Sequence, residues 1–268
     1  MITLKFYGTR GMIEEHNEWI DKRSALLIRY KGFELLIDAG DGIDISKIKP
    51  DCILITHAGH PDHSNSMITY GASDIPIYCN RESARVIQSL LGYKPDALNV
   101  IPYNRMRKWK TLSVDPLIRI YPFRVLHSII APEIGFLIQF GKGDRKIRVL
   151  IPGDILWIDK DIYKMDVDVY IGDGSSLDRD IVRLHKEKKI PFGHASIRRQ
   201  LRWIIEAGIP IAIFRHWGKW AIPLSKSEVR EKIKELAEGK VKVLIAFDGS
   251  QFTIDRTDIA TSRSPLSV

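Results

Sequence analysis

The sequence predicts a single mixed α/β domain in which two β-sheets pack between helices. Three observations favour this fold class. Short apolar runs with strand character dominate the first and middle parts of the chain, helical spacing is confined to a few segments among them, and no repeat or linker divides the sequence. A doubly wound dinucleotide-binding sheet would need a GxGxxG turn after its first strand, and the segment GTRGM at 8–12 does not contain one.

The first third of the chain predicts strands followed by one helix. Lys31 and Gly32 have the length of a two-residue hairpin turn. The segment 81–92 repeats apolar residues at helical spacing and stops at Gly92. The expected strands share apolar, β-branched sequences bounded by glycine or charge, and they are 2–6, 25–30, 33–38, 52–56 and 75–79.

The rest of the chain continues this alternation. A helix is expected over 196–208, with Ser196 as its N-cap and Gly208 as its stop, and a second over 225–239. We expect the single domain to cover residues 1–258 and the polar end, 259–268, to fray. The remaining expected strands are 117–123, 134–140, 147–152, 167–172, 211–214, 241–247 and 252–255.

The composition of the 268 residues, with 44% hydrophobic and 28% charged side chains, excludes a disordered chain and a disulfide scaffold. Cys52 and Cys79 lie in apolar runs, which predicts buried free thiols. No window approaches 18 uninterrupted apolar residues, so no membrane span is expected. The N-terminus lacks the pattern of a signal peptide, and a cytoplasmic location follows as the default expectation.

The formal net charge of +8 suits an anionic partner such as nucleic acid. Abundant isoleucine and lysine with only four glutamines also suit a thermophile, so the same charge has a second explanation. The segment 103–110 mixes cations with aromatic residues, and Arg198, Arg199 and Arg202 share one helix face. For each set, phosphate contacts and an ordinary solvated surface remain equal alternatives. The oligomeric state is open, with a dimer plausible.

The strongest chemical signal is the segment 56–63, THAGHPDH, which follows an apolar strand. It holds three histidines and one aspartate, the donors that Zn²⁺ and similar ions take in hydrolase sites. Three distant residues, His127, Asp154 and His216, each stand at the end of an apolar run. A single histidine in such a place is more often structural, but three strand-end donors together with this cluster favour a metal centre.

These residues, in this order, resemble the metallo-β-lactamase superfamily, whose hallmark is T-H-x-H-x-D-H followed by a histidine, an aspartate after a strand and a final histidine. The glycine turn at 8–11, LLIDAGDG at 35–42 and AFDGSQFTI at 246–254 extend the resemblance over nearly the whole chain. It implies a four-layer αββα sandwich with the metals at one edge. The residues matching the hallmark are Thr56, His60, Asp62, His63, His127, Asp154 and His216.

The resemblance implies two divalent cations, with Zn²⁺ expected and Mn²⁺ or Fe²⁺ as alternatives. One would take His57, His60 and His127, the other would take Asp62, His63 and His216, and Asp154 would bridge them. In this pattern a water held between the ions becomes the attacking hydroxide.

The chain departs from the hallmark at one place, because Ala58 and Gly59 separate His57 from His60 where the family has one residue. A bulge at Gly59 would bring His57 back to the metal, since glycine adopts backbone angles closed to other residues.

Three further residues are candidates for roles beside these donors. His194, in Gly-His-Ala-Ser, resembles a His-Ser segment of tRNA 3′-end endonucleases and related phosphodiesterases, which implies a proton donor; the alternative is a histidine that only starts a helix. Asp38 is expected to orient a ligand. Asp173, with Ser175 and Ser176, either belongs to a network that supports the ligands or forms an ordinary turn, and the turn is preferred. The expected catalytic residues are therefore Asp62 and His194.

The predicted function is a metal-dependent hydrolase that acts on phosphodiester bonds, with a nuclease among the candidates. A hydrolase of a small molecule, such as a thioester, lactone or cyclic phosphodiester, shares all the same ligands. That alternative stays open because the sequence shows no long arm that could grip a polynucleotide. A metal-binding protein without turnover is the third possibility, and only the altered spacing at His57 supports it.

Overall fold

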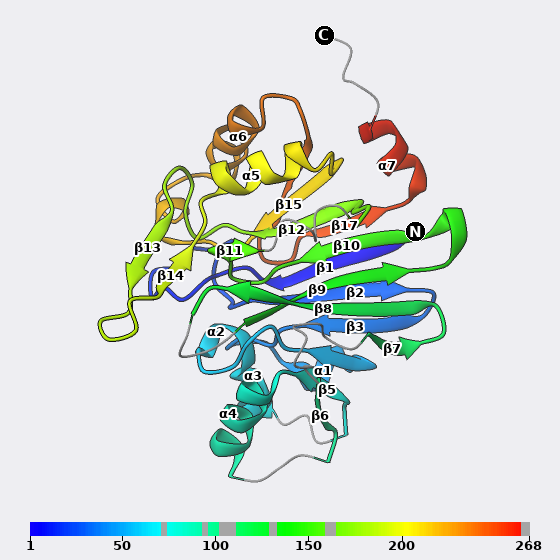
Figure 1. The fold of residues 1–268 in the computed structure, drawn as a ribbon, viewed down its shortest axis with the longest axis vertical. Helices are drawn as coiled ribbons and strands as arrows, with labels where there is room; N and C mark the ends of the chain where they lie inside the picture. Colours follow the sequence, from blue (N-terminus) through cyan, green and yellow to red (C-terminus); the bar gives the residue numbers. More distant parts are fainter. Residues whose placement is uncertain (71–73, 93–95, 102–110, 129–132, 159–164, 264–268) are drawn as a thin grey trace.

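The fold is a sandwich of two large sheets in the computed structural model, which describes residues 1–70, 74–92, 96–101, 111–128, 133–158 and 165–263. Helices cover both outer faces, with α5 and α6 on one side and α2, α3 and α4 on the other (Figure 1). This confirms the four-layer αββα class. None of the helices in these ranges is long and apolar enough to cross a membrane.

The first sheet joins the N-terminal strands to one strand from near the C-terminus. The pair β2–β3 turns at Lys31 and Gly32, as the sequence predicts. In spatial order the strands are β17 (Gln251–Ile254), β1 (Ile2–Gly8), β2 (Ala25–Tyr30), β3 (Phe33–Ile37), β4 (Cys52–Leu54), β5 (Ile77–Cys79) and β6 (Leu98–Val100).

The second sheet is antiparallel at one side and parallel at the other, because β10, β12, β15 and β16 run in the same direction. The pair β9–β10 turns through the short helix η1 (Gly143–Arg145). In spatial order the strands are β11 (Trp157–Ile158), β8 (Ile118–Leu126), β9 (Glu133–Phe140), β10 (Ile147–Ile151), β12 (Val169–Asp173), β15 (Ile211–Arg215) and β16 (Lys242–Ile245), with β7 (Leu112–Asp115) pairing β8.

The core lies mainly between the sheets. In β1, Ile2, Leu4 and Phe6 are fully buried in the inter-sheet cluster, whereas the residues that alternate with them are half-buried, as expected for a strand with one core face. Two further clusters fill the outer faces, one beneath α5 (Ile197–Glu206) and α6 (Lys226–Ala237) and one beneath α4 (Arg81–Leu91). Each sheet is therefore apolar on both faces, and the polar site residues gather at its edge.

Helix ends follow the capping residues in the sequence. The Ser196 side chain accepts a hydrogen bond from the backbone of Arg199 at the start of α5. Ser225 and Glu228 form a reciprocal capping box on α6. Gly92, in the left-handed region, ends α4. The remaining helices are α1 (Ile45–Ile48), α2 (Pro61–Ser64), α3 (Ser66–Tyr70), α7 (Arg256–Arg263) and the 3₁₀ turn η3 (Lys219–Ala221).

The expectation that the chain frays after Asp258 is wrong for residues 259–263, which continue helix α7. Asp255 accepts hydrogen bonds from the first backbone amides of this helix, and Ile259 is fully buried. Arg256 and Arg263 both contact the buried carboxylate of Asp168. One apolar side chain and these ion pairs hold the helix, and neither produces a clear helical stripe in the sequence. Residues 264–268 lie outside the described ranges.

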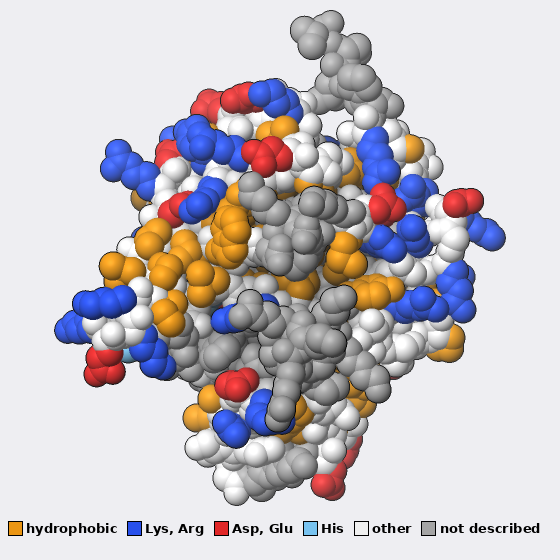
Figure 2. All heavy atoms as spheres, viewed as in Figure 1, with side chains coloured by type: hydrophobic (Ala, Val, Ile, Leu, Met, Phe, Trp, Pro, Cys, Tyr) orange, Lys and Arg blue, Asp and Glu red, His pale blue; other side chains and the backbone are white. Residues whose placement is uncertain are grey.

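A second difference is the hairpin formed by β13 (Ile181–Leu184) and β14 (Pro191–His194), since neither strand is among those expected from the sequence. The hairpin projects from the body of the molecule (Figure 1), and Lys and Arg side chains gather on it (Figure 2). Val182 and Leu184 are more than half exposed. Two short strands with little buried surface give no alternating pattern, so periodicity could not identify them.

The two cysteines give a test of the core. Cys52 and Cys79 are free and buried, as predicted, and burial raises the pKa of each thiol to about 12. We expect neither thiol to react with a disulfide reagent at pH 8 in the folded protein, and both to react in guanidinium chloride, because the nucleophile is the thiolate. A spectrophotometric thiol count measures this. Rapid reaction of either cysteine without denaturant would contradict the buried placement.

Candidate metal centre

The candidate centre lies at one edge of the sandwich, where residues from both sheets meet. Strands β4, β8, β10, β12 and β15 all end there, and β9 begins there because it runs antiparallel to β8 and β10. A direct link joins the two sheets at this edge, since the backbone amide of Ile134 donates to the carbonyl of Thr56 at 3.0 Å. This hydrogen bond places His57, after β4, next to Glu133, at the start of β9.

The first sheet contributes donors from the loop after β4 and from α2. Asp62 and His63 lie in that helix and are fully buried. The Asp38 carboxylate, which follows β3, accepts hydrogen bonds from the backbone amide of Thr56 (2.8 Å) and from His63 Nδ1 (3.0 Å). Asp38 therefore orients His63, as expected, and leaves its Nε2 directed at the other donors.

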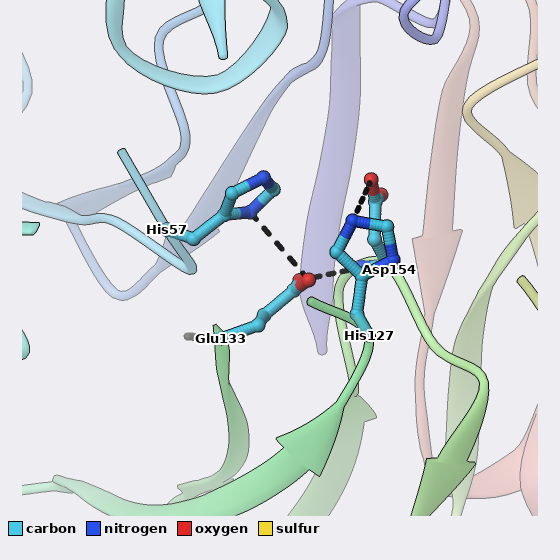
Figure 3. Close-up of side chains that lie close together, drawn as sticks. All are labelled: His57, His127, Glu133 and Asp154. Carbon is cyan, nitrogen blue, oxygen red and sulfur yellow. Dashed lines mark hydrogen bonds and ion pairs between the residues drawn. The ribbon is translucent and has the colours of Figure 1, made fainter. Parts of the chain in front are cut away.

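The second sheet contributes His127, Glu133 and Asp154 (Figure 3). His127 Nδ1 donates to the carbonyl of Gly193 at 2.9 Å, so its Nε2 is the nitrogen left for a ligand, 3.7 Å from Asp154 Oδ2. Glu133 Oε1 accepts the backbone amide of Asp154 at 2.5 Å. The turn at Gly153 depends on glycine, because a Cβ there would lie 1.8 Å from this oxygen.

His216 follows β15 with a positive φ of 62°, a conformation that costs energy for a residue other than glycine. Its Nε2 lies 3.0 Å from Asp62 Oδ2, and its Nδ1 lies 3.0 Å from Asp154 Oδ1. Gly11 packs against the ring, since a Cβ on that glycine would lie 3.1 Å from Cε1 of His216. The glycine turn at the start of the chain thus supports the last predicted ligand.

Three groups of side chains in the described ranges bring potential ligand atoms within 4.8 Å of one another. Asp154 belongs to all three groups, which makes it the central residue of the centre. The groups are His57, His127, Glu133 and Asp154; Asp62, His63, Asp154 and His216; and Asp154, Asp173, His194 and His216.

Four buried atoms of the first two groups have no hydrogen-bond partner, namely His57 Nδ1, Glu133 Oε2, Asp62 Oδ1 and His63 Nε2. Buried polar atoms are costly when unpaired, and most are satisfied in native proteins. Imidazole nitrogens and carboxylate oxygens are also the donors that first-row divalent cations bind. The arrangement therefore fits a metal centre. His57 Nδ1 and Glu133 Oε2 belong to the first group, and Asp62 Oδ1 and His63 Nε2 belong to the second.

Burial and neighbouring charges shift the pKa values of these groups in different directions. Burial lowers the pKa of His57 well below its ordinary value, and His63 lowers it further. Burial also opposes the charged form of His216, but Asp154 and other carboxylates outweigh it and raise the pKa to about 10. Burial raises the pKa of Glu133 well above its usual range, and Asp154 raises it further. Deprotonated His57 is the form that can bind a metal ion.

Asp173 and His194 form a second feature of the centre. Asp173, at the end of β12, accepts a hydrogen bond from His194 Nδ1 at 2.6 Å and from the backbone amide of Ser175 at 2.8 Å. Of the two alternatives for Asp173, these contacts favour the network that supports the candidate ligands over the ordinary turn. The ring of His194 lies 4.7 Å from that of His127, between centroids, and 19% of its side chain is exposed. His194 therefore lies beside the centre with partial access to solvent.

The structure brings together all the predicted ligands except His60. The spacing cast doubt on His57, but His57 is buried within the first group, whereas His60 lies outside all three groups with its ring centroid 5.4 Å from that of His57. Glu133 is the residue that sequence reasoning missed. Its signal was its position at the start of the apolar run that forms β9, at the same edge as the strand ends.

The basic residues that the sequence analysis considered for phosphate contacts have different outcomes. Arg198 pairs with Asp178 and Arg199 pairs with Asp180, so both cations are engaged in surface ion pairs. The basic segment 103–110 lies outside the described ranges.

Comparison with protein families agrees with this geometry. The family model described as "Beta-lactamase superfamily domain" matches residues 38–217 of the chain. The chain belongs to the metallo-β-lactamase superfamily. This confirms the expected family and, with it, the expected enzyme class of metal-dependent hydrolase.

Individual relatives of the superfamily extend the comparison. A ribonuclease Z from Agathobacter rectalis is 26% identical over 163 residues, which are 54% of this chain and 51% of that protein, so the chain spans about half the length of this curated relative. The metallo-β-lactamase fold protein YhfI from Bacillus subtilis superposes with a TM-score of 0.68 at 17% identity, covering 94% of this chain and 98% of that one. Human tRNase Z, short form, has a TM-score of 0.65 at 19% identity, covering 94% and 99%.

The contact between Asp38 and His63 can be tested directly. We expect Asp38→Asn to weaken divalent cation binding by roughly 10–100-fold, because loss of a carboxylate partner loosens a ligating histidine. Equilibrium dialysis with Zn²⁺ measures this. Asp144→Asn is the matched control, since Asp144 is exposed in the turn between β9 and β10, at the opposite edge. Equal affinities in the two variants would show that Asp38 does not support the centre.

Proposed function

We propose that this protein hydrolyses phosphodiester bonds with the help of two divalent cations. The observation that carries the proposal is the buried group of unpartnered donors beside the Asp173–His194 pair. One cation would be held by His57, His127 and Asp154. The other would be held by Asp62, His63, His216 and Asp154, the four side chains of the second group.

The cations, when bound, would activate water as a nucleophile and offset the negative charge that develops on the phosphate oxygens. Asp154 is suited to a shared position because its two oxygens face different partners: Oδ1 lies 3.0 Å from His216 and Oδ2 lies 3.7 Å from His127. Asp62 Oδ2 and His216 Nε2 lie 3.0 Å apart, so these two potential ligand atoms are neighbours in the second group. Zn²⁺ is the expected ion, with Mn²⁺ or Fe²⁺ as alternatives.

His194 donates a proton to the leaving oxygen in this proposal. Its Nδ1 is committed to Asp173, which fixes the ring orientation and leaves Nε2 for the substrate. Burial opposes protonation of His194, but the Asp173 carboxylate outweighs it and raises the pKa of the imidazole. A protonated imidazole near neutral pH is the form that a proton donor needs.

Two observations support a phosphodiester substrate. The similar proteins include a ribonuclease Z and a tRNase Z, both named for nuclease activity. The hairpin β13–β14, whose second strand ends at His194, carries exposed cations (Figure 2). These side chains could contact a phosphate backbone beside the proton donor, and they are Arg183, Lys186, Lys188 and Lys189.

A small molecule remains the second candidate substrate, and one observation favours it. Arg198 and Arg199 are engaged with Asp178 and Asp180, so these cations are not available to phosphates without breaking an ion pair. A thioester, lactone or cyclic phosphodiester would need only the metal centre and His194. The third candidate, a binding protein without turnover, loses its only support because His57 lies within the donor group.

A substrate panel tests the proposal. We expect the protein loaded with Zn²⁺ or Mn²⁺ to hydrolyse bis(p-nitrophenyl) phosphate and single-stranded RNA, and Asp62→Ala to lose this turnover. Asp144→Ala is expected to keep it, because Asp144 lies away from the site. Turnover confined to thioesters or lactones would favour the small-molecule alternative, and no turnover despite bound cations would favour the binding protein.

The role of His194 has its own test. We expect His194→Ala to lower kcat about 10²–10⁴-fold for a phosphodiester whose leaving group is a ribose oxygen, because that oxygen needs a proton. The same variant should keep most of its activity on bis(p-nitrophenyl) phosphate, since p-nitrophenolate leaves without one. Steady-state kinetics on both substrates, with metal content measured in parallel, checks this. Equal losses on the two substrates would indicate a role other than proton donation.

A further inference from the structure

We infer that Glu133 is a ligand of the first cation and fills the position that the superfamily motif assigns to His60. The inference rests on the two-cation centre proposed above. The first group consists of His57, His127, Glu133 and Asp154 (Figure 3). Glu133 is the member of this group that the motif does not supply.

Glu133 Oε2 and His57 Nδ1 are both buried, both lack a hydrogen-bond partner and lie 3.5 Å apart. This separation is long for a hydrogen bond between an imidazole and a carboxylate, which would normally be about 2.7–2.9 Å. It matches two neighbouring ligands of one ion, because bonds of about 2.0–2.2 Å in tetrahedral geometry place ligand atoms roughly 3.4 Å apart. The two unsatisfied atoms therefore point to a shared cation.

The surroundings of Glu133 hold its carboxylate in that direction. Oε1 accepts the backbone amide of Asp154 at 2.5 Å, and the absence of a Cβ at Gly153 makes room for the same oxygen. The side chain is fully buried. With Oε1 fixed in this way, Oε2 is the atom that faces His57.

His60 lies outside this arrangement. It precedes α2 as the N-cap residue, with φ −119° and ψ 138°, and it is partly exposed. Two residues, Ala58 and Gly59, separate His57 from His60. The φ of Gly59 is 115°, a backbone angle that is open only to glycine. This turn keeps His57 in the donor group and His60 outside it.

The exchange changes the chemistry of the first cation site. Two imidazoles and two carboxylates replace the three imidazoles and one carboxylate that the motif implies. Carboxylate oxygens favour harder ions, so the substitution raises the affinity for Mn²⁺ relative to Zn²⁺. The first site is accordingly a mixed nitrogen and oxygen site.

The test is a count of bound cations and their dissociation constants in two variants, by equilibrium dialysis with Mn²⁺ and with Zn²⁺. Glu133→Gln keeps an oxygen that can accept the Asp154 amide but removes the charged donor. We expect it to bind one cation with the original affinity and the second at least 100-fold more weakly, with a larger loss for Mn²⁺ than for Zn²⁺. His60→Ala is the matched control and should bind two cations with unchanged affinities.

Three outcomes would overturn the inference: two tightly bound cations in Glu133→Gln, a cation lost in His60→Ala, or equal losses of Mn²⁺ and Zn²⁺, which would indicate that Glu133 only orients His57. A wild-type protein that binds no cation would instead refute the centre as a whole. If Glu133→Gln does not fold, as judged by circular dichroism, a crystal structure of the wild type with Mn²⁺ decides, because Glu133 Oε2 must then lie within about 2.2 Å of a cation.

Discussion

The structure depends on the burial of like charges at one place. The carboxylates of Asp62, Asp154 and Asp173 lie around the same imidazoles at the edge of the sandwich, and the buried Glu133 side chain accepts the backbone amide of Asp154. Transfer of a charged side chain from water to such an interior costs several kcal/mol unless opposite charge compensates it. The packed sheets supply the rigidity that keeps these carboxylates together, since each sheet is apolar on both faces and its strands cannot slide without exposing core residues.

Much of the fold could be predicted because its strands are apolar runs with clear ends, and its main helices carry cap residues such as Ser196 and Ser225. The positions of the candidate ligands could be predicted to lie together for a related reason. His127, Asp154 and His216 follow apolar runs directly, and parallel strands end at one edge. Sequence reasoning therefore located the site without knowing which strands were neighbours.

The missed features have physical reasons as well. Glu133 is the first residue of β9 and lies just before the expected strand 134–140. The expected ligands all follow apolar runs, whereas β9 runs antiparallel to its neighbours and so brings its first residue to the edge where they end. The choice between His57 and His60 depends on the backbone at Gly59, which spacing does not determine. Helix α7 is held by contacts to Asp168, nearly a hundred positions earlier in the chain, and the hairpin β13–β14 buries too little to show a pattern.

The backbone of Gly193 has a wider consequence. Its amide donates to the carbonyl of His127 at 2.8 Å, and its own carbonyl accepts the His127 ring nitrogen. Gly193 also lies within β14, one residue before His194. The hairpin β13–β14 and the His127 side chain are thus connected through the hydrogen bonds of Gly193. Displacement of the hairpin would therefore disturb the orientation of the His127 ring, because that ring is held by the Gly193 carbonyl.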